Sequence, residues 1–500
     1  MRVVSADEAR ALDVRTIAAG TPGLVLMKRA ANAVVREIAG AIGRRPARAG
    51  RVVVLAGPGN NGGDGFEISR LLMAGRLTGN VETLLLGNPQ HLTSDARRTY
   101  HRLEQAGGAI REVNDARELE PLAVATLIVD ALFGTGLKRR VAPDGLPARA
   151  IGLASRGRAF VVSVDLPSGL SADEAEPWDP SVRADLTVTF GWPKPCHVER
   201  GAAARCGRIA VADLGFVQPT EPAAREAVAV RDVAALFPRR AAESHKGTFG
   251  RLLVLGGSRE MAGAPALVCR AAHRAGAGLV TASVPDDVRA ILHALTPETT
   301  SVGAEHDFGR YSALAVGPGW GASASARETL ARALAAPVPA VFDADALNLA
   351  GPASAFAGRP APTVLTPHPG EAGRLLGTTA DEVNADREAA AVRIARSAGA
   401  VVVLKGFRPI VAEPGGRAVP VLAGNPALAS GGTGDVLTGV VGALLARGLA
   451  AWDAACAAAW LHGTAGDVLR EAKGEESVTA SDVVEALPEA FLAASEAAAT

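Results

Sequence analysis

The chain has 500 residues, more than one ordinary hydrophobic core holds, so we expect two domains. Lys and Arg together number 52, as do Asp and Glu, so the formal net charge is zero at pH 7. This balance excludes the long-range attraction on which nucleic-acid-binding proteins and proteins of anionic membrane surfaces depend. The balance does not exclude local anion-binding sites, because backbone amides bind phosphate without any net charge on the protein.

The cysteines and the N-terminal residues indicate the cellular compartment of the protein. Cys196, Cys206, Cys269 and Cys456 form no C-x-x-C pair, which argues against a disulfide framework or a zinc site. The first residues, MRVVSADEARALD, carry charges where a signal peptide needs an apolar core. No stretch approaches the roughly 18 uninterrupted apolar residues of a membrane span. We therefore expect a cytoplasmic protein with reduced thiols and no membrane partner.

Short apolar runs alternate with segments of helical spacing along the first half of the chain. The runs are continuous rather than alternating, which is typical of strands covered on both faces of a parallel sheet. Helical spacing appears at 64–75 and 94–106. The pattern predicts a doubly wound, Rossmann-like α/β sheet. Its predicted strands are 51–57, 81–87, 125–134, 160–169 and 186–191.

The alternation breaks at GFVQPTEPAAREA (215–227), which contains two prolines and no apolar run. We predict a linker there, between a domain of residues 1–216 and a domain of residues 227–500. The alternation then resumes and predicts a second α/β domain, with no sequence repeat between the halves. Its predicted strands are 251–258, 278–284, 313–319, 340–347, 363–371 and 400–406.

The first predicted strand runs into GPGNNGGDG (57–65), where Gly57, Gly59 and Gly62 satisfy G-x-G-x-x-G. Glycine allows close approach of the backbone to a ligand, and amides at a helix start bind anions. The acidic residue that dinucleotide-binding sheets carry about 20 positions later is missing, since the next strand ends in LLGN. A tight turn with Asp64 as helix cap is the alternative.

Two further strands end in polar clusters. Asp130 closes LIVD and precedes ALFGTGL and three consecutive cations, Lys138, Arg139 and Arg140. Asp165 closes VVSVD and precedes LPSG. Ligands of open α/β sheets bind beyond the carboxyl ends of the strands, so we expect the three loops at one edge. One such Asp is commonly a helix cap, but three clusters together favour a binding site.

In this order, NNGGDG, VDALFGTG and VDLPSG resemble the signature of the NAD(P)HX epimerase family, over roughly residues 1–216. Those enzymes interconvert the R and S forms of NAD(P)H hydrated at C6 of the nicotinamide ring. The resemblance implies a potassium ion held by Asn61, Asp130 and Ser168. Asp165 is the candidate acid–base catalyst, because a carboxyl group suits proton transfer at a carbon that bears a hydroxyl. Substrate contacts are implied at Asn60, Asn61, Gly62, Gly63, Asp64, Gly134, Thr135, Gly136, Leu137, Lys138, Arg139, Arg140 and Asp165.

In the second half, the segment GNPALASGGTGDVLTGVVGALLARG (424–448) carries the main signal. Small residues lead into Asp435 at the start of an apolar helix, where unpaired amides face an anion beside a carboxylate. In phosphoryl transfer the amides stabilise the phosphoryl charge, and Asp435 takes the proton of the acceptor hydroxyl. No G-x-x-x-x-G-K-[ST] is present, so a P-loop is excluded, and G-x-G-D resembles the ribokinase-like fold. A Gly-rich turn capped by Asp435 is the alternative.

Other polar residues of this half also follow predicted strands. Lys405 follows AVVVL, and His368 stands in TPHPGE. Asp343 and Asp345 in FDADALN suit either a place near magnesium or helix capping.

Together, SHKGTFG, LLVLGGS, AVGPG, DADALN, TPHPGE, LKG and GGTGDVLTG resemble the NAD(P)HX dehydratase family over nearly all of 240–470. The resemblance implies a ribokinase-like domain that uses ADP or ATP with magnesium. It implies substrate contacts at Ala264, Gly319, His368 and Asp435. Nucleotide contacts are implied at Lys405, Gly406, Phe407, Arg408, Pro409 and Gly434.

These resemblances predict a bifunctional enzyme, in homo-oligomeric form, that epimerises R- and S-NAD(P)HX and dehydrates the S form at the expense of ADP or ATP. The motifs select neither ADP nor ATP, and neither NADHX nor NADPHX. One alternative is a ribokinase-like small-molecule kinase, which would leave a stable phosphorylated product. A second is an N-terminal half that only binds a dinucleotide or a partner. An NAD-dependent dehydrogenase is less favoured, because the ribose-binding acid is missing.

Overall fold

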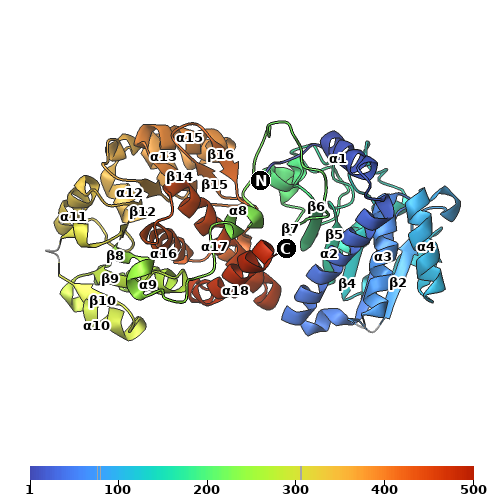
Figure 1. Ribbon diagram of the computed structural model, residues 1–500, viewed down its shortest axis with the longest axis horizontal. Helices are drawn as coiled ribbons and strands as arrows, with labels where there is room; N and C mark the ends of the chain where they lie inside the picture. The colour runs from blue at the N-terminus through green and yellow to red at the C-terminus, as the bar shows by residue number, and fades with distance from the viewer. Residues whose placement is uncertain (76, 79, 304–306, 500) are drawn as a thin grey trace. The chain divides into compact units, whose positions relative to one another are not determined.

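The computed structural model describes residues 1–75, 77–78, 80–303 and 307–499, which divide into two compact units, Met1–Glu226 and Ala227–Thr500. The first unit extends to Glu226 rather than to 216, because the segment predicted as a linker is bonded back to it. The Val3 amide donates to the Arg225 carbonyl at 2.9 Å, and the Val217 amide donates to Thr16 Oγ1 at 3.0 Å. Figure 1 shows each unit as a sheet flanked by helices.

The first unit contains a seven-stranded sheet in the order β3-β2-β1-β4-β5-β6-β7, with every neighbouring pair parallel. The order reverses between β1 and β4, so the prediction of a doubly wound, Rossmann-like sheet is confirmed. Strands β3 and β7 were not predicted from the sequence, because both edge strands have few buried residues and show weaker apolar runs. The strands are β1 (Arg51–Ala56), β2 (Asn80–Leu85), β3 (Ala109–Glu112), β4 (Leu127–Ala131), β5 (Phe160–Val164), β6 (Leu186–Phe190) and β7 (Arg208–Ala212).

Alternate residues of the central strand β1 pack on opposite faces of this sheet. Val52 and Val54 lie in a buried cluster with residues of α2 and α3, whereas Val53 and Leu55 lie in a separate cluster with residues of α5. Burial on both faces explains the continuous apolar runs in the sequence. The helices of this unit are α1 (Ala6–Ala18), α2 (Gly23–Arg44), α3 (Asn60–Ala74), α4 (Ser94–Gln105), α5 (Leu146–Arg156), α6 (Pro195–Val198) and α7 (Arg200–Ala203).

The second unit contains a nine-stranded sheet in the order β10-β9-β8-β11-β12-β13-β14-β15-β16. Pairing is parallel from β10 to β14, and β14, β15 and β16 are antiparallel. The sequence analysis missed β10, β15 and β16, which have three residues each. The strands are β8 (Arg251–Leu255), β9 (Leu279–Ser283), β10 (Thr300–Val302), β11 (Ala313–Val316), β12 (Ala340–Phe342), β13 (Thr363–Leu365), β14 (Val401–Leu404), β15 (Ile410–Ala412) and β16 (Ala418–Pro420).

Helices cover both faces of this second sheet (Figure 1). They are α8 (Val230–Ala234), α9 (Gly263–Arg274), α10 (Asp286–Leu295), α11 (Ala324–Ala335), α12 (Asp345–Ala350), α13 (Pro369–Leu376), α14 (Ala380–Ala385), α15 (Arg387–Ala398), α16 (Thr433–Ala446), α17 (Ala451–Lys473) and α18 (Ala480–Ala499). The two units also contain short 3₁₀ helices, at Pro46–Ala49, Pro89–His91, Ala116–Val124, Lys246–Phe249, Phe308–Arg310, Ala353–Phe356 and Pro426–Leu428.

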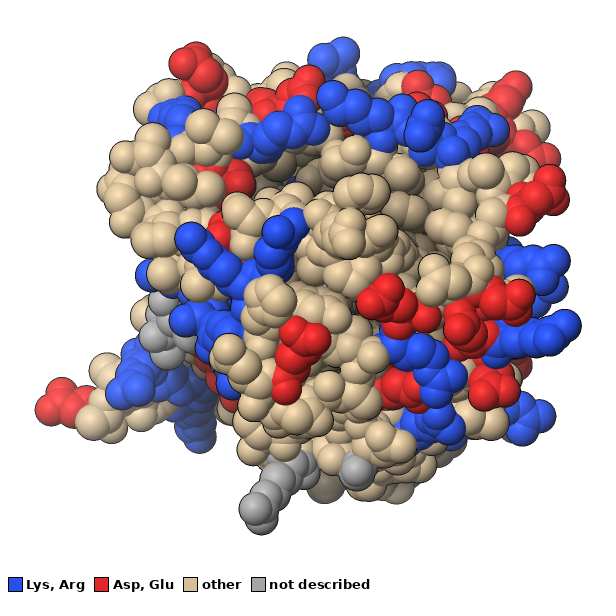
Figure 2. Space-filling model, turned by 90° about the vertical axis from the view of Figure 1, so that its right-hand side faces the viewer, with Lys and Arg blue, Asp and Glu red and all other residues tan. Residues whose placement is uncertain are grey.

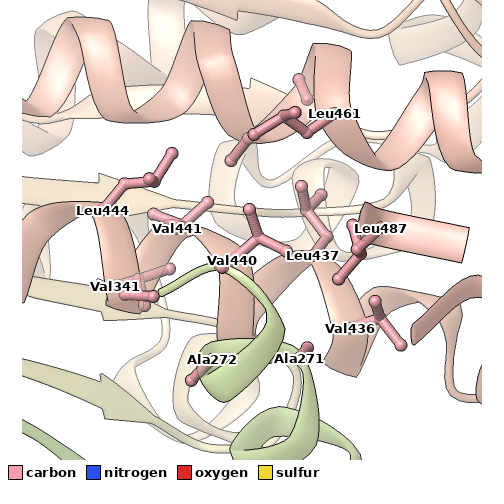
Figure 3. Close-up of a cluster of buried hydrophobic side chains, with 14 of the residues drawn as sticks. Ala271, Ala272, Val341, Val436, Leu437, Val440, Val441, Leu444, Leu461 and Leu487 are labelled. Atoms are coloured by element: carbon pink, nitrogen blue, oxygen red, sulfur yellow. The ribbon is translucent and has the colours of Figure 1, made fainter. Parts of the chain in front are cut away.

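Helix α16 is buried on every side along most of its length. Figure 3 shows Val436, Leu437 and Val440 among side chains of α9, α17 and α18. Helix α9 approaches closely at Gly439, where an added Cβ would overlap the Val268 carbonyl oxygen and lie 2.8 Å from the Ala271 Cβ. This close packing holds α16, whose first turn carries Asp435, against α9.

Charges of both signs are mixed on the surface. On the face drawn in Figure 2, basic and acidic side chains are interspersed, in line with the equal totals of the sequence. Within the described ranges, no helix is both long enough and apolar enough to cross a membrane.

Gly439→Ala should destabilise the second unit, because the added methyl group forces α9 and α16 apart. Overpacking of this kind costs about 1–3 kcal/mol. Gly263→Ala, on α9 itself, is the matched control, since its Cβ meets no atom within 4 Å. Urea unfolding should show a lower midpoint for Gly439→Ala than for the control. Equal midpoints would contradict the close packing.

Candidate active sites

The three polar loops of the first unit meet at one edge of its sheet. They follow β1, β4 and β5, and β4 pairs with both of the other strands in parallel register. The point where the strand order reverses lies between β1 and β4, which is where ligands of doubly wound sheets bind. The sequence therefore placed these loops at the correct edge.

Asp130 anchors the loop that follows β5. Its buried carboxylate accepts hydrogen bonds from Ser163 Oγ and the Ser168 amide, both at 2.8 Å. Ser168 Oγ in turn accepts from the Phe133 amide at 2.8 Å. Burial raises the pKa of the Asp130 carboxyl, and the hydrogen bonds from Ser168 and Ser163 oppose this shift only in part.

The residues around Asp130 suit a monovalent cation. The Leu132 amide lies at a long 3.5 Å from Asp130 Oδ1, so this oxygen keeps acceptor capacity. Asn61 lies against Gly134, and its buried Nδ2 has no hydrogen-bond partner within the described ranges. An amide with an unsatisfied end can turn its oxygen toward a cation. A cation there would offset the buried carboxylate charge, so the residues fit potassium.

Asp165 stands directly after β5 with φ +67°, in the left-handed region that residues other than glycine seldom adopt. Its Oδ1 accepts from Lys194 Nζ at 2.7 Å and from Thr189 Oγ1 at 3.0 Å. Burial raises the pKa of Asp165, but the Lys194 ammonium outweighs it and brings the pKa below its ordinary value. Asp165 is therefore ionised at neutral pH.

Asp64 has the opposite environment. Burial first, and then the charges of Asp165 and Asp13, raise its pKa well above the ordinary value. Asp64 lies within the first two turns of α3, which begins at Asn60 with Gly59 as the capping position, so it is not the helix cap. Two carboxyl groups with pKa values moved apart are typical of an acid–base site.

Gly62 and Gly63 of the first loop are required by packing within the unit. A Cβ on Gly62 would overlap the Gly57 carbonyl oxygen, and one on Gly63 would lie 2.6 Å from the Met27 side chain. Beyond β4, Gly134 and Thr135 are half-buried, Leu137 packs against the core, and the remaining predicted contacts are exposed: Gly136, Lys138, Arg139 and Arg140.

The second site lies at the carboxyl edge of the other sheet and is built around Asp343, which directly follows β12. Lys405, after β14, donates to Asp343 Oδ1 at 2.7 Å, and Thr438 of α16 donates to Oδ2 at 2.7 Å. Asp343 thus accepts side-chain bonds and is not a helix cap, whereas Asp345 Oδ2 accepts from the Gly321 amide at 2.7 Å. Burial lowers the pKa of Lys405, but Asp343 and other nearby carboxylates outweigh it and raise the pKa.

Asp435 lies in the first turn of α16, behind Gly432, whose φ of +89° turns the chain into the helix. A Cβ on Gly434 would lie 3.3 Å from Lys405 Nζ, so the helix start and the lysine face the same space. Burial, followed by the charge of Asp343, raises the pKa of Asp435 to about 7. A carboxyl group with this pKa is suited to act as a general base at neutral pH.

His368 caps α13, and its Nδ1 accepts from the Gly370 amide at 3.0 Å and the Glu371 amide at 3.4 Å. Its ring is half exposed, with Nε2 3.4 Å from Glu371 Oε1. Glu371 Oε2 lies 3.7 Å from Lys405 Nζ, so the capping turn reaches the cluster around Asp343.

Two other groups of predicted contacts are also brought together. A Cβ on Gly319, which has φ +71°, would lie 2.9 Å from the Ala264 Cβ. The loop of Lys405, Gly406, Phe407, Arg408 and Pro409 is held by Arg387, which donates to the carbonyls of Leu404, Lys405 and Phe407. Arg408 is buried, so the loop offers its backbone and Lys405 rather than the Arg408 guanidinium.

The sequence analysis missed Lys194, Thr189, Thr438 and Arg387. Lys194 carried a signal, because it follows the predicted strand 186–191 at the same sheet edge as the three polar loops. Arg387 and Thr438 carried none, since both lie within helices, and Thr438 lies 95 residues along the chain from Asp343. A cavity of about 750 Å³ beside α5 contains none of the predicted site residues in its lining.

Asp435→Asn should stabilise the second unit at alkaline pH. The folded-state pKa of about 7 lies above the ordinary 3.8, so the wild-type free energy of unfolding falls as pH rises between these values. One pKa unit equals about 1.4 kcal/mol, so the total is at most about 4 kcal/mol. In urea unfolding without nucleotide, the variant's advantage should be large at about pH 8 and small at about pH 4.5. An equal gain in the free energy of unfolding at both pH values would contradict the raised pKa of Asp435.

Comparison with known proteins covers both units. The family model described as YjeF-related protein N-terminus matches residues 23–196, and the one described as NAD(P)H-hydrate dehydratase matches residues 252–489. The bifunctional NAD(P)H-hydrate repair enzyme of Moorella thermoacetica is 38% identical over 93% of this chain and 92% of its own. That of Escherichia coli is 36% identical over 87% of this chain and 84% of its own.

A solved structure matches the second unit. The ADP/ATP-dependent NAD(P)H-hydrate dehydratase from Bacillus subtilis, co-crystallised with ATP and Mg²⁺, is 32% identical, with a TM-score of 0.51. The match covers 54% of this chain and 98% of the other, in agreement with the predicted ribokinase-like fold. The identities hold across both units, and each unit places its predicted polar residues at one sheet edge. The chain belongs to the family of bifunctional NAD(P)H-hydrate repair enzymes.

Proposed function

We propose that the first unit epimerises R- and S-NAD(P)HX and that the second dehydrates S-NAD(P)HX with hydrolysis of ADP or ATP. The observation that carries this proposal is the presence, in one chain, of two separate sites, each with a lysine-bound carboxylate beside a carboxyl group of raised pKa. One unit then supplies the S form that the other consumes. A small-molecule kinase would not need the first unit, and a binding module would not need the Asp64 and Asp165 arrangement.

In the first unit, Asp165 and Asp64 are the groups that exchange protons with the hydrated ring. The three loops that carry the predicted contacts surround this pair, and the exposed Lys138, Arg139 and Arg140 suit the phosphates of the dinucleotide. Potassium held by Asn61, Asp130 and Ser168 would order the three strand ends at which these residues lie.

In the second unit, Asp435 takes the proton of the C6 hydroxyl, whose oxygen attacks the terminal phosphoryl group of the nucleotide. The phosphoryl bond to the departing nucleotide breaks, giving AMP from ADP or ADP from ATP. The C6–O bond then breaks with help from the ring nitrogen, phosphate leaves, and loss of a C5 proton gives NAD(P)H. Lys405 and the amides at the start of α16 bind the transferring phosphoryl group. Magnesium, when bound, neutralises charge on the nucleotide phosphates.

The first test uses mixed R- and S-NADPHX, with absorbance at 340 nm followed in the presence of ADP, ATP or neither. We expect nucleotide-dependent recovery of nearly all the hydrate. Asp435→Asn should lower dehydration by about 10²–10⁴-fold, the usual contribution of a general base, and leave epimerisation intact. Recovery of only the S fraction by the wild type would reduce the first unit to a binding module. Equal loss of both activities in folded Asp435→Asn would contradict the division of labour.

Potassium should stabilise the first unit by binding the folded state. Thermal unfolding in potassium chloride and in tetramethylammonium chloride of equal ionic strength separates binding from screening, since only a bound ion adds RT ln(1 + [L]/Kd). We expect a higher midpoint in potassium for the wild type and no difference for Asp130→Asn. A potassium effect of the same size in this variant would place the ion elsewhere. Homo-oligomeric assembly and a cytoplasmic location stay predictions.

A further inference from the structure

Lys194 is a buried lysine that follows β6, and its side chain is 3% exposed. Its ammonium donates to Asp165 Oδ1 at 2.7 Å, to Thr189 Oγ1 at 2.8 Å and to the Phe190 carbonyl at 3.3 Å. An ammonium group has three donors, so each of them finds an acceptor. The lysine therefore has one defined position against Asp165.

The carboxylate of Asp165 is held at one oxygen only. Oδ1 accepts from Lys194 and from Thr189, whereas none of the described residues donates a hydrogen bond to Oδ2. A carboxylate oxygen has two acceptor sites, so Oδ2 keeps its full capacity to take a proton. The side chain of Asp165 is 12% exposed, at the sheet edge where the predicted substrate loops meet.

Stability alone does not account for this pair. A buried ion pair is often no more stabilising than apolar residues of the same volume, because desolvation offsets the attraction. Asp165 also holds a left-handed backbone conformation, which costs free energy in a residue with a Cβ. Conformations of this kind cluster at functional sites, where surrounding contacts fix a reacting group in one direction.

We infer that Lys194 is a positioning residue of the epimerase site, which holds Asp165 as an oriented carboxylate whose Oδ2 accepts a proton from the hydrated ring. Asp64 is the neighbouring carboxyl group that donates a proton. The inference rests on the proposed epimerase function. An isomerisation takes up no net proton, so the site needs one acceptor and one donor, and two carboxyl groups in unequal surroundings supply both.

The surroundings of the two groups agree with this assignment. The charged groups around Asp165 are Lys194 and His197, from the segment after β6, and Asp64 of α3. Burial raises the pKa of Asp165, and Lys194 and then His197 lower it to a net value below the ordinary one. Burial raises the pKa of Asp64, and the charge of Asp165 raises it further. The two neighbouring carboxyl groups thus have pKa values shifted in opposite directions, that of Asp165 downward and that of Asp64 upward.

The test uses Lys194→Met in the full chain, which removes the charge and keeps most of the side-chain volume. S-NADPHX is incubated without nucleotide, and the R form is quantified by chromatography, so that epimerisation is measured apart from dehydration. We expect kcat of epimerisation to fall at least about tenfold, with KM little changed, because Lys194 acts through Asp165. Dehydration of S-NADPHX with ADP, by the second unit, should stay at the wild-type rate.

Lys473→Met is the matched control, since it breaks a Lys–Asp pair at the surface of the second unit and should leave both activities unchanged. The acid limb of the epimerisation pH profile gives a second readout. In Lys194→Met, burial raises the pKa of Asp165 without the opposing effect of the ammonium. The acid limb should therefore shift to higher pH by about one unit or more. A purely structural role for Lys194 would lower the rate without moving this limb.

Wild-type epimerisation with an unchanged rate and pH profile in Lys194→Met would overturn the inference. If Lys194→Met does not fold, the kcat of epimerisation is measured in Thr189→Val instead. This variant removes the second hydrogen bond to Asp165 Oδ1 and keeps the lysine. A lower kcat for this variant supports the positioning network, and an unchanged kcat overturns it. Absence of epimerisation in the wild type would instead overturn the proposed function itself.

Discussion

Both units depend on one physical constraint, which is that a carboxylate buried at the end of a strand is strongly unfavourable unless it is paired. Asp165 is paired with Lys194, and Asp343 is paired with Lys405, in each case at 2.7 Å. In each pair, the lysine and the aspartate follow different strands of the same sheet. The parallel order of the strands brings each lysine to its partner, so the sheet topology decides which ion pair forms at each site.

Each pair changes the carboxyl group beside it. Asp64 and Asp435 both have a pKa raised by burial first and by the paired carboxylate second, that of Asp435 to about 7. Each site thus contains one carboxylate bound by a lysine and a second carboxyl group with a raised pKa. The arrangement costs stability, because an unpaired buried carboxylate opposes folding once it ionises. The buried helix α16 and the tightly packed start of α3 hold these groups in place despite that cost.

The sequence contained enough information for the architecture of both units. Continuous apolar runs predicted the central strands, because residues on both faces of a parallel sheet are buried and no alternation survives. It missed β3 and β7, which are largely half-buried, and β10, β15 and β16, which have three residues each. The first turn of α3 was predicted as a loop, because Asn60 to Gly63 are poor helix formers that their packing overrides.

The sequence by itself determined which polar residues lie at each sheet edge, since an Asp that ends a buried strand can only emerge at its carboxyl end. It also placed Asp435 at the start of a helix, from the small residues before it and the apolar run after it. Only the tertiary structure decided the partners. Lys194 and Lys405 reach their carboxylates across 29 and 62 residues of chain, and the pKa values follow from burial and from those partners. The local spacing of residues in the sequence encodes neither the ion-pair partners nor the pKa values.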